Sequence, residues 1–136
     1  MIALDTNVLV RYVVRDDPEQ TRVATKLIET VLERGESVLI TRVVLCELVW
    51  VLSRRYRLPK KKIVQVLDWL RRSSQSVLEG RDGIKAAVDS FESGSGDFAD
   101  YLIAEAASEQ GCVAIATFDR VLWEDPRFRD PAVEIG

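Results

Sequence analysis

The sequence predicts an α/β fold in which a parallel sheet has helices on both faces. Short apolar runs, of which residues 2–4 are the first, alternate with longer segments whose apolar residues recur at helical spacing. Residues that can cap a helix follow several of the runs directly. Because helical segments between successive strands are the connections that parallel strands need, this alternation favours a parallel sheet.

In the N-terminal half, capping and breaking residues mark the helix boundaries. Pro18 stands at a first helical position, Gly35 follows the last turn of the same helix, and Thr41 can cap the next one. Leu58-Pro59 then breaks the chain before an amphipathic helix. The expected elements are a buried strand at residues 2–4, helices at 8–14 and 18–34, a strand at 37–40, and helices from 42 to about 55 and from 60 to 72.

The C-terminal half contains the one flexible-looking segment, residues 92–96. Asp97 after it can cap a helix, with Asp100 at the third helical position as in a capping box. Gly111 ends that helix, and residues 113–116 are apolar throughout, as a buried parallel strand requires. The remaining expected elements are a strand at 77–78, a helix at 80–91 and an edge strand at 133–135.

The composition predicts a single domain, residues 1–136, that is large enough to bury a core. Apolar residues make up 47% of the chain, and no apolar run is long enough to span a bilayer. No basic segment with a small-residue cleavage site opens the sequence, so no signal peptide is expected. Cys46 and Cys112 lie in apolar runs and are interpreted as reduced core residues of a cytoplasmic protein.

Charge and histidine content restrict the chemistry. The chain has no histidine and no Cys-x-x-Cys pair, which excludes the usual zinc sites and His-based acid–base catalysis. The net charge of −3 excludes polyanion binding by bulk electrostatics, yet basic residues cluster in one short segment. Its candidate contacts with a nucleic acid or a protein partner are Arg54, Arg55, Lys60, Lys61 and Lys62; the alternative is a solvated turn between helices.

Isolated acidic residues are the candidate functional groups. Asp5 follows the first strand, where ligands bind at the carboxyl end of a parallel sheet, although it could simply cap the next helix. Glu47 is the only charge in the apolar run 43–52, which predicts deep burial. A buried salt bridge is the structural alternative for Glu47. Asp119 follows another strand, with Thr117 before it, which repeats the pattern at Asp5.

Several carboxylates in one place would repel one another, and a hard divalent cation removes that conflict. Such a cation can activate water and neutralise charge on a phosphodiester. Asp5, Glu47, Asp100 and Asp119 are therefore the candidate catalytic set. Asp5, Asp100 and Asp119, with Asp97 beside them, are the candidate ligands of Mg²⁺ or Mn²⁺. Thr6, Asn7 and Thr117 are candidate donors that would orient the carboxylates.

At these residues the chain resembles the PIN-domain family, in particular the VapC-type toxins of toxin–antitoxin pairs. The matching segments, in the family's order, are residues 5–9, Glu47 in its apolar helix, residues 97–104 and residues 111–120. The resemblance implies a three-layer α/β/α sandwich with a central twisted parallel sheet. It also implies a Mg²⁺- or Mn²⁺-dependent ribonuclease, a homodimer and a neutralising antitoxin. The family's acidic quartet would fall on Asp5, Glu47, Asp100 and Asp119, with Asp97 as an accessory acid.

Other functions are open to the same sequence. A nucleic-acid-binding module of this fold that does not cleave would act with a partner at DNA, but binding alone needs no acidic pocket. A phosphotransfer domain would use Asp5 as phosphate acceptor. The dehalogenase type of that chemistry needs a second Asp where this chain has Asn7, and the receiver type needs an acidic pair before its acceptor strand. A purely structural protein leaves Glu47 unexplained.

Overall fold

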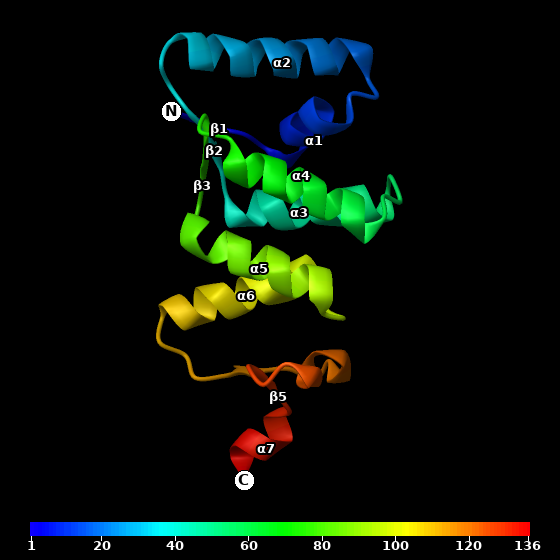
Figure 1. Cartoon of the computed structure of the whole chain (residues 1–136), viewed down its shortest axis with the longest axis vertical. Coiled ribbons are helices and arrows are strands. Elements are labelled where there is room, and N and C mark those ends of the chain that lie inside the picture. Colours follow the sequence, from blue (N-terminus) through cyan, green and yellow to red (C-terminus); the bar gives the residue numbers. More distant parts are fainter. The chain divides into compact units, whose positions relative to one another are not determined.

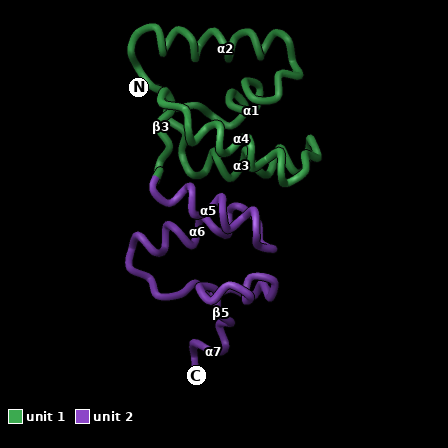
Figure 2. Tube along the Cα trace, in the orientation of Figure 1, with its two compact units in different colours: residues 1–81 green, residues 82–136 purple.

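The computed structural model describes residues 1–136 and confirms the predicted α/β class with a parallel sheet. Contacts within the chain divide it into two compact units, Met1–Arg81 and Asp82–Gly136, which Figure 2 draws in different colours. The expectation that residues 1–136 form one domain stays a prediction.

The sheet of the N-terminal unit is parallel throughout. Its strands are β1 (Ile2–Ala3), β2 (Val38–Ile40) and β3 (Ser76–Leu78), in the order β1-β2-β3. Ile2 pairs with Val38, and Val38 pairs in turn with Ser76. Strand β1 therefore lies at an edge of this sheet, and the chain leaves it through Leu4 and Asp5 into the first helix.

The helices of the N-terminal unit are α1 (Thr6–Val14), α2 (Pro18–Glu33), α3 (Arg42–Arg54) and α4 (Lys60–Arg72). The bounds of α2, α3 and α4 agree with the predicted ones to within one residue, whereas α1 begins two residues earlier than predicted. The Asp17 carboxylate accepts from the backbone N–H of Gln20, and the Thr41 hydroxyl accepts from that of Val44. Helix α1 packs against both α2 and α3 (Figure 1). Its residue Leu9 is buried in the core of this unit, where the buried leucines of α3 also lie.

The C-terminal unit contains α5 (Arg81–Ser93, which begins at the unit boundary), α6 (Phe98–Glu109), β4 (Ile115–Ala116), the 3₁₀ helix η1 (Arg120–Glu124), β5 (Phe128–Arg129) and α7 (Pro131–Ile135). Strands β4 and β5 form a second parallel sheet. Aromatic side chains hold the helices and this sheet together. Phe91 meets Phe98 edge to face at 5.9 Å between ring centres, and Tyr101 meets Phe128 at 6.3 Å.

The predicted deep burial of the third helix is wrong for one of its faces. Leu45, Leu48 and Leu52 are fully buried, but Val43 and Trp50 are 65% and 62% exposed. Glu47 lies on the same face as these two and is exposed as well. The core of the unit contacts only one stripe of α3, so the opposite stripe remains at the surface despite its apolar residues. Glu47 is therefore not a buried charge, and a buried salt bridge does not explain it.

The predicted burial of two strands and of both cysteines is also greater than the structure shows. Ile2 is 41% exposed and Val113 is 86% exposed, since both belong to edge strands or their approaches. Strand β4 itself is shorter than predicted and covers only Ile115–Ala116. Neither cysteine forms a disulfide, as predicted, but Cys112 is exposed and Cys46 half-buried, so neither is a core residue.

The predicted edge strand at residues 133–135 is wrong, because these residues belong to helix α7. Asp130 accepts from the backbone N–H of Ala132 and Pro131 occupies the first helical position, so the Asp-Pro pair starts a helix. The same signal was recognised at Pro18. Helix α5 also continues through residues 92 and 93, which were expected in the flexible loop.

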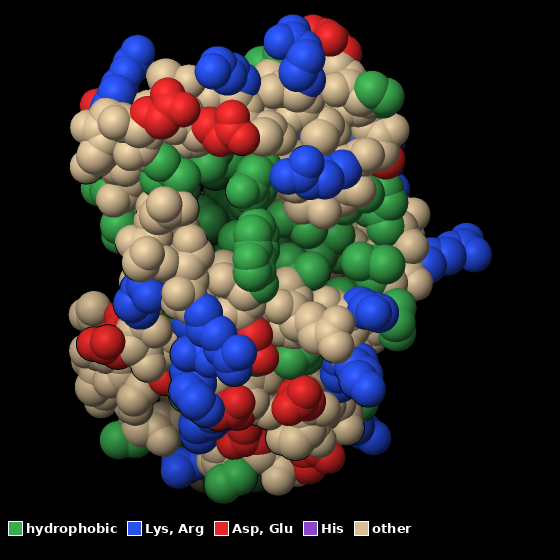
Figure 3. All heavy atoms as spheres, turned by 45° about the horizontal axis from the view of Figure 1, so that its top comes forward, with side chains coloured by type: hydrophobic (Ala, Val, Ile, Leu, Met, Phe, Trp, Pro, Cys, Tyr) green, Lys and Arg blue, Asp and Glu red, His purple; other side chains and the backbone are tan.

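No helix of the structure has the length and apolarity to span a bilayer. On the face drawn in Figure 3, acidic and basic side chains are interspersed around apolar ones, in keeping with the small net charge of −3.

Candidate active site

Asp5 caps helix α1 with one oxygen of its carboxylate. Its backbone is extended, and Oδ1 accepts a hydrogen bond of 2.7 Å from the backbone N–H of Thr6. This bond fixes the orientation of the carboxylate and leaves Oδ2 able to bind another group. The capping alternative is therefore correct for one oxygen and does not exclude a ligand at the other.

Thr6 connects Asp5 to Glu47. Its side chain is buried, and its Oγ1 donates a hydrogen bond of 3.1 Å to Oε2 of Glu47 on helix α3. A hydroxyl has one proton to donate, so this bond commits Thr6 to orienting Glu47. The buried Thr6 thus bonds both carboxylates, that of Asp5 in the turn after β1 and that of Glu47 on the exposed stripe of α3.

The two carboxylates line one cavity of about 290 Å³, which has room for roughly ten water molecules. Asn7, Arg11 and Arg55 line it too. The N-terminal unit therefore brings together the predicted residues Asp5, Thr6, Asn7, Glu47 and Arg55.

Arg11 is a member of this cavity that the sequence analysis missed. Its Nε donates to Gln20 at 2.6 Å, and its Nη1 donates to Asp16 at 3.0 Å and to the Tyr56 hydroxyl at 3.2 Å. The Tyr56 hydroxyl in turn donates to Asp16 at 2.8 Å. That hydroxyl, and then the charge of Arg11, hold the pKa of the Asp16 carboxyl below its ordinary value. The spacing of Asn7 and Arg11, one helical turn apart, was the signal that could have found it.

In the C-terminal unit, Asp97 and Asp100 start helix α6 in a capping-box arrangement, as predicted. Oδ2 of Asp100 accepts a hydrogen bond of 2.9 Å from the backbone N–H of Asp97. Burial raises the pKa of the Asp100 carboxyl, and the negative charges of Asp97 and Asp119 raise it further, although the hydrogen bond from Asp97 opposes them. The unit thus places three of the predicted acids close enough for their charges to interact.

Asp119 caps the 3₁₀ helix η1. Its Oδ1 accepts from the backbone N–H of Val121 at 3.1 Å, and its own backbone N–H donates to Oγ1 of Thr117 at 3.1 Å. Thr117 therefore fixes the backbone of Asp119, whereas it was expected to donate to a carboxylate. The indole Nε1 of Trp123 donates to the Thr117 carbonyl at 3.0 Å, which anchors the end of β4.

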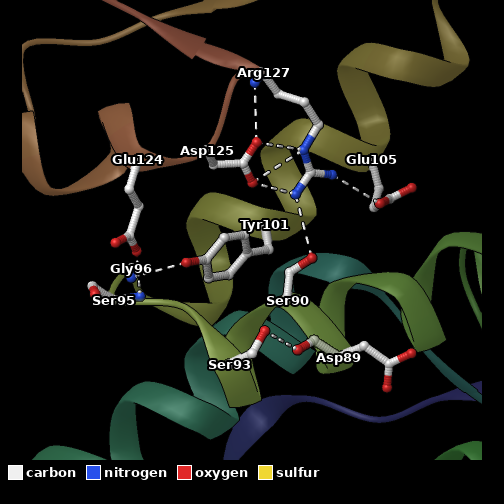
Figure 4. Close-up of polar contacts among 10 residues, drawn as sticks. All are labelled: Asp89, Ser90, Ser93, Ser95, Gly96, Tyr101, Glu105, Glu124, Asp125 and Arg127. Carbon is white, nitrogen blue, oxygen red and sulfur yellow. Dashed lines mark hydrogen bonds and ion pairs between the residues drawn. The ribbon is translucent and has the colours of Figure 1, made fainter.

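A buried tyrosine, also missed from the sequence, positions the loop that leads to Asp97. The backbone N–H of Gly96 donates to the Tyr101 hydroxyl at 3.0 Å, and that of Ser95 donates to Glu124 at 3.0 Å (Figure 4). A Cβ atom at Gly94 would overlap the Tyr101 hydroxyl and would lie 2.8 Å from the Ser90 carbonyl oxygen. Glycine is thus required for the loop to close over Tyr101.

Arg127, in the same unit, connects residues of several elements through its hydrogen bonds (Figure 4). Arg127 binds Asp125 through two nitrogens, its Nη2 at 2.8 Å from Oδ2, and also contacts Glu105 of α6 and Ser90 of α5, each at 3.3 Å. The hydrogen bonds from Arg127 hold the pKa of the Asp125 carboxyl below its usual value.

Gly94→Ala is expected to destabilise the protein by about 1–3 kcal/mol, since the added methyl group has to displace the Tyr101 hydroxyl or the backbone of α5. Ser95→Ala is the matched control, because it alters the next residue and keeps the backbone N–H that bonds Glu124. Urea unfolding of the two variants measures the difference. Equal stabilities would show that the loop adapts and that Tyr101 does not fix it.

The basic segment lies where α3 ends and α4 begins. Arg54 is the last residue of α3, Arg55 is its C-cap, and Lys60, Lys61 and Lys62 form the first turn of α4. All five side chains are exposed. Among them, only Arg55 lines the cavity of Asp5 and Glu47.

Each unit by itself offers carboxylates, at a strand end in the N-terminal unit and at helix starts in the C-terminal unit. Carboxylate oxygens are ligands that Mg²⁺ prefers. Burial, and after it the negative charges of Asp97 and Asp119, raise the pKa of the Asp100 carboxyl in the C-terminal unit. No group of three or more acids, cysteines or histidines is arranged as a ready-formed metal site.

Comparison with known proteins identifies the family of the chain. The sequence model of the PIN domain family matches residues 2–128, which include every predicted acid. A VapC ribonuclease from Aquifex aeolicus (strain VF5) is 24% identical over 120 residues, which cover 88% of this chain and 88% of the relative. The chain therefore belongs to the PIN domain family.

Proposed function

We propose that the chain is a metal-dependent endoribonuclease and the toxin of a VapBC-type toxin–antitoxin pair, which forms a homodimer and is neutralised by an antitoxin protein. One observation carries the proposal furthest. Asp5 and Glu47, which come from distant parts of the sequence, line one cavity and are oriented by the same buried threonine. The family match and the VapC ribonuclease relative support the reaction class.

Asp5, Asp100 and Asp119, with Asp97 beside them, would hold Mg²⁺ or Mn²⁺. When bound, the cation would supply activation of water and neutralisation of charge on the phosphodiester. The remaining residues act on these carboxylates. The Thr6 backbone N–H and hydroxyl fix Asp5 and Glu47, Thr117 fixes the backbone of Asp119, and the Asp97 N–H fixes Asp100. Because hydrogen bonds already hold the carboxylates of Asp5, Glu47 and Asp100, little ordering of these side chains is left for the moment of binding.

The test is RNA cleavage by the purified chain, freed of any partner. A single-stranded RNA is expected to be cut in Mg²⁺ or Mn²⁺, and cutting is expected to stop when EDTA removes the metal ion. RNA that is bound but never cut would indicate the non-cleaving module instead. Cutting that continues in EDTA would contradict the metal dependence, and acyl-phosphate labelling at Asp5 would indicate phosphotransfer.

A further inference from the structure

Two arginines line the cavity of Asp5 and Glu47, and only one of them forms an ion pair within the protein. Arg11 is engaged on several sides by Asp16, Gln20 and Tyr56, so its charge is largely balanced within the protein. Arg55 forms no ion pair in the structure, and its side chain is exposed. Arg55 lines the cavity with Asp5 and Glu47, and no ion pair balances its charge, so it is able to bind an anion that enters the cavity.

Arg55 is nevertheless held in place. Its guanidinium carbon lies over the ring of Tyr56, 5.9 Å from the ring centre. The Tyr56 hydroxyl is fixed by its bonds with Asp16 and Arg11, so the ring that supports Arg55 does not rotate freely. Arg11 thus serves as an anchor for Tyr56, and Tyr56 positions Arg55.

The geometry of a guanidinium selects the class of ligand. Its planar fork of donors matches the oxygens of a phosphate in two parallel hydrogen bonds, whereas a lysine would offer a point charge. The neighbouring lysines, Lys60, Lys61 and Lys62, do not line the cavity. The residues of the basic segment therefore differ in position, and among them only Arg55 lines the candidate active site.

We propose that Arg55 is a phosphate-binding residue of this site, which holds one phosphate of the RNA backbone beside Asp5 and Glu47, and that Tyr56 positions it. The proposal rests on the proposed function for the identity of the substrate. It extends that function by separating one phosphate contact from the rest of the basic segment.

The experiment measures binding, not cleavage. A labelled single-stranded RNA is titrated onto Asp5→Asn protein in EDTA across a range of salt concentrations, so that neither catalysis nor a metal ion contributes. Adding Arg55→Ala is expected to weaken binding about tenfold, as for loss of a hydrogen bond to a charged group. It is also expected to reduce the steepness of the salt dependence by about 0.7, the value for one phosphate contact on a single strand.

Arg54→Ala is the matched control, because it removes the same charge from the preceding exposed residue, which lies outside the cavity. It is expected to leave the salt dependence nearly unchanged. Arg55→Lys, which keeps the charge and loses the fork, is expected to restore only part of the affinity. Equal effects of Arg54→Ala and Arg55→Ala would overturn the proposal, and so would the absence of RNA binding by the Asp5→Asn protein.

The role of Tyr56 is tested by a double-mutant cycle. Tyr56→Leu is expected to weaken RNA binding when Arg55 is present and to add little when Arg55 is already alanine. A purely structural tyrosine would give additive effects, which would overturn the positioning role. These binding results do not depend on cleavage. If the unmodified chain shows no EDTA-sensitive RNA cutting, the proposed ribonuclease function is rejected. Equal RNA binding by the Arg54→Ala and Arg55→Ala variants would reject only the phosphate contact of Arg55.

Discussion

Asp5→Asn, Glu47→Gln and Asp119→Asn are each expected to lower metal-dependent RNA cleavage by more than about 100-fold. Loss of a residue that merely orients a metal ligand already costs about 10–100-fold, and these residues are proposed to act directly. Each substitution removes a negative charge while it keeps the size of the side chain. Initial rates of RNA cutting at fixed Mn²⁺ measure the effect.

Asp5 and Asp119 both cap helices. A control is therefore needed to distinguish a loss of catalytic activity from a loss of helix stability. Asp17→Asn makes the same change at a residue that caps α2 and lies outside the cavity. Asparagine caps about as well as aspartate, so this variant is expected to retain its fold and its activity. If cutting survives all three substitutions in the candidate site, the assignment of that site is wrong.

The metal-free protein is expected to lose stability as pH rises through the region just above the ordinary pKa of an aspartate. In the folded protein the pKa of Asp100 is raised by burial and by the charges of Asp97 and Asp119. Between the unfolded and the folded pKa, the folded state binds more protons than the unfolded state, so stability falls with increasing pH. Thermal melting in EDTA across this range measures the effect.

One variant and the addition of Mn²⁺ identify the source of this loss of stability. Asp100→Asn keeps an oxygen that can accept from the Asp97 N–H. It is therefore expected to remove the fall in stability that Asp100 causes and to melt higher than the parent above this pH range. Mn²⁺ is expected to stabilise the parent more than this variant, because a ligand that binds only the folded state stabilises it. Asp125 supplies a control of opposite sign. Its lowered pKa contributes stability that is present above the unfolded value and is lost as pH falls.

A parent protein that is indifferent to both pH and Mn²⁺ would contradict the clustering of Asp97, Asp100 and Asp119 as the origin of the raised pKa. A parent that responds to pH but not to metal would retain the cluster and reject its role as a cation site.

Helix boundaries were predictable from the sequence because caps act over a few residues. Thr41, Pro18 and Asp97 each stand where a helix begins, and a local hydrogen bond or a fixed backbone angle accounts for each. The mistaken strand at residues 133–135 shows the cost of overlooking such a signal, since Asp130 and Pro131 start a helix there. Apolar character alone does not decide between strand and helix in so short a segment.

Burial was less predictable, because it depends on which elements pack together. The run around Glu47 is apolar on every side, yet Val43 and Trp50 remain at the surface because the core contacts one stripe of the helix. The supporting residues of the candidate site were missed for a related reason. Arg11 and Tyr101 act through contacts with residues of other elements, Tyr56 and Gly96, and a motif search along the chain does not detect these pairs.

The carboxylates that start helices α1, α6 and η1 restrict which substitutions these three positions can accept. At Asp5, Asp97 and Asp119, the side chain that would serve chemistry also starts a helix. Residues that cannot cap would cost helix stability at these positions, whether or not the side chain takes part in catalysis. Asparagine satisfies the helix and discards the charge. Under the proposed function, one such substitution at any of these positions would therefore keep the start of the helix and remove the carboxylate, and the two sequences would differ by an amide alone.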